Sequence, residues 1–279
     1  MVRTLIPVFL ILVVACSGKK GRSFIPHIPG YDESKMEQMV MPKKLKEISG
    51  MFFMADGRIA ANNDEKGILF LLKFENSSDV NPDNIESFEF AGKADYEDLV
   101  KVDSVYYLME SNGNVHEVFG PDSSKEYEFE KIKKTEFESM YFDRAANKLI
   151  LITKDHKLAD HFIFAYSFDL VTKTFSEEPY YKISMREVHF RLKNSSTQCK
   201  PSAAAIHPIL HKLFIVASIG KVILECTLDG KVEKAYQINP VLFPQPEGIT
   251  FAPNGDMYIS NEGANGKGTI LKFPYAGQQ

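Results

Sequence analysis

Five short segments share one sequence pattern, and an acidic or hydroxyl residue takes the same place in each of them. The segments begin EISGMFF, DYEDLVKV, EFESMYF, KPSAAAI and QPEGITF. The shared position is occupied by Ser49, Glu97, Glu138, Ser202 and Glu247. Carboxylates that gather at close range raise one another's pKa unless a cation neutralises them. If the five segments lie side by side, the pattern predicts a ring of side chains that could bind a cation.

A second polar position follows each segment, at the end of the next predicted strand. It is occupied by Glu65, Glu110, Lys154, Ser218 and Glu262, which follow the first position by 16, 13, 16, 16 and 15 residues. The two positions together offer oxygen atoms and little nitrogen or sulfur. This chemistry favours Ca²⁺, or Mg²⁺, over zinc, because Ca²⁺ takes six to eight oxygen ligands.

The expected metal ligands are the acids at the two positions. Glu97, Glu138 and Glu247 come first, because they share the first position, and Glu262 and Glu110 come next. The remaining residues form a secondary ring, namely Ser49, Glu65, Lys154, Ser202 and Ser218. Three further acids flank the pattern and are interpreted as outer or surface residues, namely Glu47, Asp64 and Asp95. The alternative is that the acids are solvated loop residues or pair with Lys154.

Short alternating strands must position these residues. Turn dipeptides typical of β-hairpins occur at Asp56-Gly57, Asn112-Gly113, Asp229-Gly230 and Asn254-Gly255. The first positions of successive segments are separated by 48, 41, 64 and 45 residues. A repeat of about 40–45 residues with several short strands is typical of a β-propeller. We therefore expect an all-β fold with five blades. The long interval contains either an insertion near residues 171–199 or a degenerate sixth blade.

The N-terminus is predicted to direct export and anchoring. Leu5 to Val14 form an apolar run of 10 residues, which is too short to span a membrane and has the length of a signal-peptide core. The residues before Cys16 resemble a bacterial lipobox, which implies a signal peptide over 1–15 and lipidation of Cys16. Residues 16–42 are then a tether and 43–279 the propeller. A plain cleaved signal, or a buried Cys16, is the alternative.

Composition excludes several classes of protein. The 33 Lys and Arg against 37 Asp and Glu give a net charge of −4, so a nucleic-acid partner is not expected. Three cysteines are too few for a disulfide scaffold. Cys199 and Cys226 either pair with each other or are two buried thiols. No GxSxG or HExxH motif occurs.

The repeated segments resemble the SdiA-regulated family of bacterial envelope proteins. The similarity covers residues 45 to 275 and is carried by PQPEGITFAPNGDMYISNEG, KADYEDLVKVDSVYYLMESNG and CKPSAAAIHP. It implies a five-bladed propeller, distantly similar to NHL-repeat propellers, with a calcium site and no established activity. Glu247 to Ile249 also resemble the segment start of gluconolactonases, which are metal-dependent propeller hydrolases.

Three functions are compatible with the sequence. The first is a lipid-anchored, calcium-binding propeller on the outer membrane that faces the periplasm or the cell surface and binds a small molecule or an envelope protein. The second is a metal-dependent hydrolase of lactones or phosphoesters that uses the acidic ring. The third is an interaction scaffold whose ring is closed by salt bridges without a metal.

Overall fold

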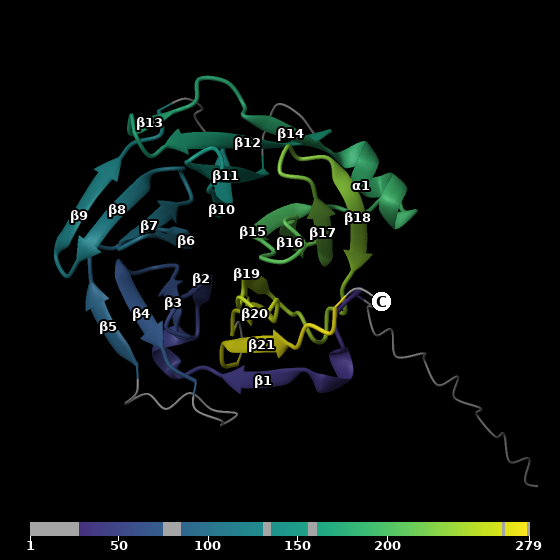
Figure 1. Cartoon of the computed structure of the whole chain (residues 1–279), viewed down its shortest axis with the longest axis horizontal. Helices are drawn as coiled ribbons and strands as arrows, with labels where there is room; N and C mark the ends of the chain where they lie inside the picture. The colour runs from purple at the N-terminus through teal and green to yellow at the C-terminus, as the bar shows by residue number, and fades with distance from the viewer. Residues whose placement is uncertain (1–27, 75–84, 131–134, 156–160, 264–265, 278–279) are drawn as a thin grey trace, which may run out of the picture.

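Short strands joined by tight turns make up most of the computed structural model, which describes residues 28–74, 85–130, 135–155, 161–263 and 266–277. The strands form five separate antiparallel sheets arranged around a central axis (Figure 1). The predicted turn glycines adopt positive φ angles, for example 92° at Gly113 and 91° at Gly255. Such angles cost glycine little, which explains why these dipeptides reverse the chain. The predicted five-bladed β-propeller is confirmed.

The first three blades follow one another along the chain. Blade 1 contains β2 (Ile48–Phe53), β3 (Ile59–Asn63), β4 (Ile68–Leu72) and β5 (Glu86–Glu89). Blade 2 contains β6 (Tyr96–Val102), β7 (Val105–Glu110), β8 (Val115–Gly120) and β9 (Ser123–Tyr127). Blade 3 contains β10 (Glu136–Asp143), β11 (Lys148–Asp155), β12 (Phe162–Asp169), β13 (Thr174–Phe175) and β14 (Tyr181–Ser184).

Blades 4 and 5 complete the ring. Blade 4 contains β15 (Lys200–Ile206), β16 (Leu213–Ile219), β17 (Val222–Cys226) and β18 (Val232–Gln237). Blade 5 contains β19 (Pro246–Phe251), β20 (Met257–Asn261), β21 (Thr269–Phe273) and the N-terminal strand β1 (Glu37–Val40). Two short 3₁₀ helices flank β1, namely η1 (Glu33–Lys35) and η2 (Lys43–Leu45).

The N-terminal strand closes the ring by pairing with the C-terminal one. β1 forms the outer edge of blade 5, where Met39 lies opposite Ile270 on β21. The inner strands then contact one another in a closed circle, in the order β2, β6, β10, β15 and β19. The folded domain therefore begins before residue 43, because part of the segment that the sequence suggested as a tether is a propeller strand.

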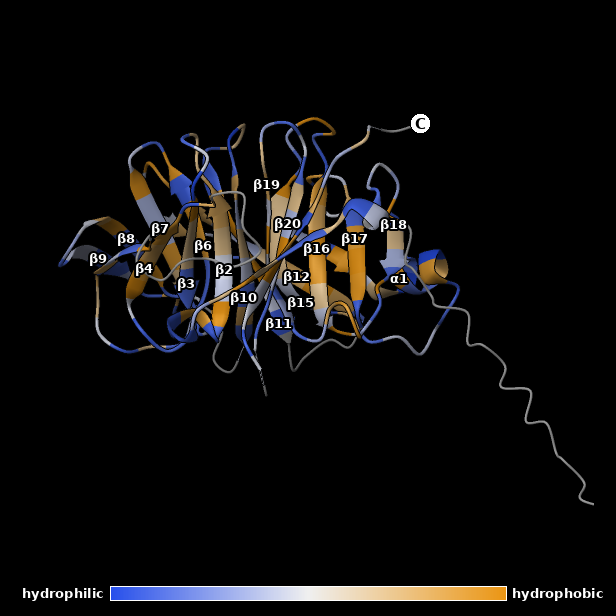
Figure 2. Ribbon diagram, turned by 90° about the horizontal axis from the view of Figure 1, so that it is seen from below, coloured by the Kyte–Doolittle hydropathy of each residue, from blue (hydrophilic) through white to orange (hydrophobic). Residues whose placement is uncertain are grey.

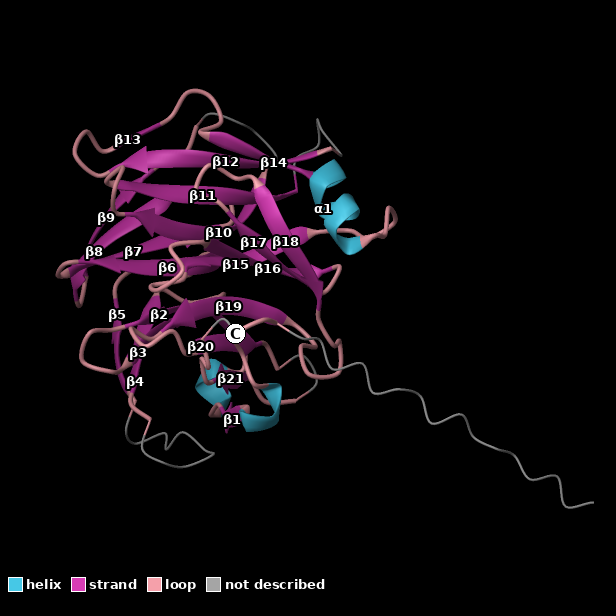
Figure 3. Ribbon diagram, turned by 45° about the vertical axis from the view of Figure 1, so that its right-hand side comes forward, coloured by secondary structure: helices cyan, strands magenta, loops and turns pink. Residues whose placement is uncertain are grey.

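The long interval between the third and fourth segments is an insertion in blade 3. After β13 the chain forms β14, which pairs with β12, and then the helix α1 (Met185–Leu192). This helix lies at the edge of the ring beside β18 (Figure 3). A degenerate sixth blade, the alternative that the sequence left open, is therefore excluded.

The hydrophobic core is divided among the five interfaces between neighbouring blades. Each interface buries its own cluster of apolar side chains, and apolar residues, in orange, make up much of the strands in the side view of the ring (Figure 2). Between blades 4 and 5, for example, the rings of Phe214 and Phe251 lie with centroids 5.4 Å apart. Full burial of one such side chain contributes about 1.5–3 kcal/mol. Each blade is thus stabilised mainly by its neighbours.

The inner strands approach one another closely around the axis. A Cβ atom at Gly50 on β2 would lie only 2.6 Å from the Cα atom of Asp98 on β6. Asp98 is itself buried, and its carboxyl accepts hydrogen bonds of 2.8 Å from the backbone N–H groups of Leu99 and Met140. Because Met140 belongs to the next blade, Asp98 joins two blades. Burial raises the pKa of Asp98 well above its ordinary value.

The predicted signal peptide over 1–15 and the lipidation site Cys16 lie outside the described residues. Within the described ranges, no helix has both the length and the apolar character needed to cross a bilayer. Cys199 and Cys226 are free thiols buried in one apolar cluster. Burial raises the pKa of Cys199 to about 12.

Candidate functional site

A β-bulge occurs in the inner strand of every blade, at the first position of the sequence pattern. In blade 2 the pairing with β7 passes from Tyr96 to Asp98 and leaves Glu97 between them without a partner. The pairing likewise skips Glu138, Ser202 and Glu247 in blades 3, 4 and 5, and it skips Ser49 together with Gly50 in blade 1. A bulge bends its strand and redirects the side chain of the extra residue. The repeated segment start therefore encodes a bulge.

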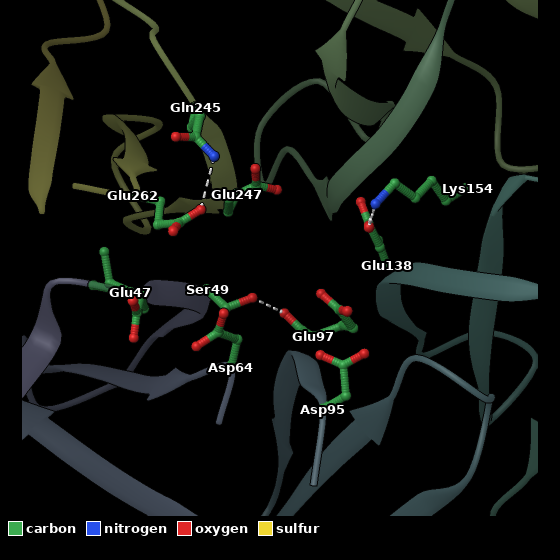
Figure 4. Close-up of a pocket in the computed structure, with 11 residues that line it drawn as sticks. Glu47, Ser49, Asp64, Asp95, Glu97, Glu138, Lys154, Gln245, Glu247 and Glu262 are labelled. Atoms are coloured by element: carbon green, nitrogen blue, oxygen red, sulfur yellow. Dashed lines mark hydrogen bonds and ion pairs between the residues drawn. The ribbon is translucent and has the colours of Figure 1, made fainter. Parts of the chain in front are cut away.

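The bulges lie beside a polar cavity of about 210 Å³ at one end of the channel, which we call the mouth (Figure 4). Seven carboxylate side chains line it, from Glu47, Asp64, Asp95, Glu97, Glu138, Glu247 and Glu262. The other lining residues are Ile48, Ser49, Gln245 and Lys154. Lys154 is the one cationic side chain among these lining residues, so the mouth carries a large excess of negative charge.

The mouth brings together most, but not all, of the residues that the sequence singled out. Four of the five expected metal ligands line it, namely Glu97, Glu138, Glu247 and Glu262, together with Ser49 and Lys154 of the secondary ring. Four expected residues do not line it, namely Glu65, Glu110, Ser202 and Ser218. Glu65 is exposed to solvent, and Glu110 turns instead toward His116, where Oε1 lies 2.7 Å from Nε2.

The strand register explains why Glu65 and Glu110 do not line the cavity. Ile48 pairs with Asn63, and Tyr96 pairs with Glu110. In each blade, the second residue of the repeated segment has a partner on the next strand, and the residue after that partner reaches the mouth end of the channel. These residues are Asp64, Ser111, Lys154, Ser218 and Glu262. The sequence pattern selects Glu65 in blade 1, one residue after Asp64, and Glu110 in blade 2, one residue before Ser111. A shift of one residue in a strand moves a side chain to the opposite face.

Three acids that sequence reasoning placed outside the ring are part of the mouth. Glu47 and Asp95 each precede the first residue of an inner strand, and their carbonyls accept backbone hydrogen bonds from Asp64 and Ser111. Asp64 occupies the second position in blade 1. Its Oδ1 atom is buried and has no hydrogen-bond partner among the described residues. Glu47 and Asp95 are the first residues of their repeated segments, and this shared place was the available signal for both.

Hydroxyl and amide groups hold the acidic side chains and the inner strands in place. Ser218 Oγ donates a 3.0 Å hydrogen bond to Glu247 Oε1, and Gln245 Nε2 donates one of 2.9 Å to Glu262 Oε2. Ser49 Oγ donates to the carbonyl of Glu97. Ser202 Oγ donates to the carbonyl of Pro246 at 2.6 Å and does not line the cavity. The serines of the secondary ring thus link neighbouring blades.

The mouth disfavours the ionised forms of four of its acids, namely Asp64, Glu97, Glu247 and Glu262. Burial, reinforced by Asp95, raises the pKa of Glu97 to about 8. Burial also raises the pKa of Glu247 to about 7, although Ser218 lowers it, and the pKa of Asp64 to about 6. Burial raises the pKa of Glu262, and the negative charge of Glu47 raises it further. A cation in the cavity would reverse these effects, because it would stabilise every ionised carboxylate around it.

Comparison of the sequence with protein-family models and with curated proteins finds no match. Solved structures share the fold. A calcium-binding protein, regucalcin from Agrobacterium tumefaciens strain C58, is 10% identical with a TM-score of 0.51, and the match covers 81% of this chain and 90% of that one. A candidate gluconolactonase is 11% identical with a TM-score of 0.50, covering 83% and 76%. At these identities the similarity shows a β-propeller fold alone.

Proposed function

We propose that the protein is a lipid-anchored β-propeller of the bacterial envelope that binds Ca²⁺ at the mouth of its channel. The observation that supports the calcium site is the mouth itself, where seven carboxylates and one ammonium group surround a cavity of about 210 Å³. The proposed anchor rests on the sequence before Cys16 alone. Buried charges of one sign are costly unless they are compensated. A divalent cation compensates them with least rearrangement.

The donor atoms suit a hard divalent cation. The cavity offers carboxylate and amide oxygens and no imidazole or thiolate, which favours Ca²⁺ over zinc. Asp64 Oδ1 is a buried acceptor without a partner in the described structure, and a cation would satisfy it. Asp64, Glu97, Glu247 and Glu262 would hold the ion. The neighbour regucalcin is a calcium-binding protein, which agrees with this proposal.

Water is expected to complete the coordination. Among the described residues, no three acidic oxygens of the mouth come within 4.8 Å of one another. The cavity volume exceeds that of one water, about 30 Å³, several times. Ca²⁺ accepts such mixed shells of carboxylates and water, and extracellular sites of about 10⁻⁴–10⁻³ M affinity are functional.

Calcium titration calorimetry tests this site. The wild-type chain should bind Ca²⁺, and Glu247→Gln should weaken binding by about tenfold or more, because it removes one ligand charge. Unchanged affinity in Glu247→Gln would remove this residue from the site. For the anchor, Cys16→Ala should release the chain from the membrane fraction, and a variant that still sediments with membranes at high salt would contradict lipidation.

A metal-dependent hydrolase is the second candidate, and the number of acids in the mouth favours it, because seven carboxylates line the cavity and one could transfer a proton while others hold a cation. A bound cation would supply Lewis acidity toward a substrate oxygen. Glu97 would then take up a proton at its carboxylate. Lactone and phosphoester hydrolysis by the wild type, lost in Glu97→Gln while Ca²⁺ is saturating, would support this candidate over a binding role.

A further inference from the structure

A second group of ligating side chains lies on blade 2, outside the mouth. Glu110 ends β7, His116 lies on β8 and Glu126 lies on β9. One carboxylate oxygen of each glutamate and a ring nitrogen of His116 all lie within 4.8 Å of one another. Within the described part of the chain this is the one group of three acidic, His or Cys ligand atoms that meet so closely.

The strand register brings these residues together. His116 and Glu126 are direct cross-strand partners, so their side chains leave the sheet on the same face. Glu110 is the residue before the turn that connects β7 to β8, and its backbone N–H donates to the carbonyl of Asn114. Leu108 is the cross-strand partner of His116, and Glu110, two residues further along β7, leaves the sheet on the same face as both.

His116 is fixed in position by its surroundings. It is 5% exposed, and its ring makes edge contacts with Tyr96 and Phe90, with centroids 5.4 and 6.1 Å away. The ring therefore has little freedom to rotate. Its Nε2 atom is directed at Glu110 Oε1 at a distance of 2.7 Å. A buried imidazole that is held with one nitrogen facing carboxylates is a suitable metal ligand.

Two asparagines orient the carboxylates. Asn112 Nδ2 donates to Glu110 Oε2 at 3.0 Å, and Asn114 Nδ2 donates to Glu126 Oε1 at 2.7 Å. Both amides are oriented in turn by the backbone, because Asn112 Oδ1 accepts from the N–H of Asn114 and Asn114 Oδ1 accepts from the N–H of Phe129. Groups that orient the ligands in this way are typical of metal centres. A simple ion pair of Glu110 with His116 would not require Asn114 to hold Glu126 beside it.

We propose that Glu110, His116 and Glu126 form a binding site for a first-row divalent transition metal such as Zn²⁺. One imidazole nitrogen with two carboxylates is a ligand set that zinc accepts, and water would fill the fourth position. Ligands in a tetrahedral zinc site lie about 3.4 Å apart, given bonds of about 2.1 Å. The ligand atoms must approach this spacing when zinc binds, and mainly the exposed side chain of Glu126 has to move. This site differs in chemistry from the oxygen-only mouth.

Zinc titration of the full chain in excess Ca²⁺ tests the proposal, because Ca²⁺ occupies the mouth. Calorimetry should show one Zn²⁺ per chain. Glu126→Gln should weaken zinc binding by about tenfold or more, whereas Glu89→Gln, a matched change at another exposed glutamate on blade 1, should not. Circular dichroism checks that each variant is folded.

Co²⁺ provides an independent measurement at the same site. The wild type should give the visible absorption bands of a protein-bound, low-symmetry Co²⁺ ion, Zn²⁺ should remove them, and Glu126→Gln should lack them at equal Co²⁺ concentration. Absence of zinc binding to the wild type would overturn the proposal. Equal zinc affinity of the wild type and Glu126→Gln would also overturn it, because the ion would then lie elsewhere.

Discussion

The ammonium group of Lys154 forms an ion pair with the carboxylate of Glu138 inside the mouth. These residues face each other from the first two strands of blade 3. The charge of Lys154 also opposes the rise that burial causes in the pKa of Glu97 and in that of Glu247. Lys154 therefore provides part of the neutralisation that a bound cation would provide, and the two positive charges compete for the same acids.

Replacement of Lys154 should separate these two effects. Lys154→Met should strengthen Ca²⁺ binding on the order of tenfold, because a repelling charge is removed from a site of reduced dielectric constant. In chelator the same variant should be destabilised by about 1–3 kcal/mol, because the Glu138 side chain, 10% exposed, loses its partner. Calcium titration and chemical unfolding measure both quantities, with the exposed Lys43→Met as control. Weaker calcium binding in Lys154→Met would contradict the competition.

The neighbouring acids Asp64 and Glu65 provide a test of the register. Asp64 lines the mouth, whereas Glu65 is exposed. Asp64→Asn should lower the calcium affinity by about tenfold or more, since the number of charged ligands sets the affinity. Glu65→Gln should leave it nearly unchanged. The opposite order in calorimetry would mean that β3 is paired one residue away from the register described above.

Close packing around the channel predicts an effect on stability at Gly50. Gly50→Ala would place a methyl group 2.6 Å from the Cα atom of Asp98, so the inner strands of blades 1 and 2 must separate. We expect destabilisation of about 2–4 kcal/mol, measured by urea unfolding. Gly92→Ala is the control, because its added Cβ would meet nothing within 4 Å. Equal stability of the two variants would show that the inner strands are not packed as described.

The sequence predicted the repeat better than the registers within it. Five repeated segments and four turn dipeptides predicted five blades, because hairpin chemistry is local, although the long interval left a sixth blade open. The ring was harder to predict, because the β-bulges at residues such as Glu97 and Glu247 change which residue of the next strand lies opposite. Counting along the chain therefore selected Glu65 and Glu110 instead of their neighbours. Closure by β1 was missed because its partner β21 lies more than 200 residues away.

The mouth should make stability depend on pH when no cation is present. Glu97 and Glu247 have pKa values of about 8 and about 7 in the folded protein, above the ordinary value of 4.5. The folded protein therefore binds protons more tightly than the unfolded chain. Stability in chelator should then fall as the pH rises from about 4.5 to about 8. Calcium should offset this fall, because it stabilises the ionised carboxylates.

Thermal unfolding of the full chain at several pH values, with Ca²⁺ and with chelator, tests the central claim most directly. A ligand present at a hundredfold excess over its Kd stabilises the folded state by about 2.7 kcal/mol, which corresponds to about 5 °C or more in Tm. We predict that Ca²⁺ raises Tm, and that the increase is greater at about pH 8 than at about pH 5. A Tm that is the same in Ca²⁺ and in chelator at every pH would contradict a calcium site at the mouth.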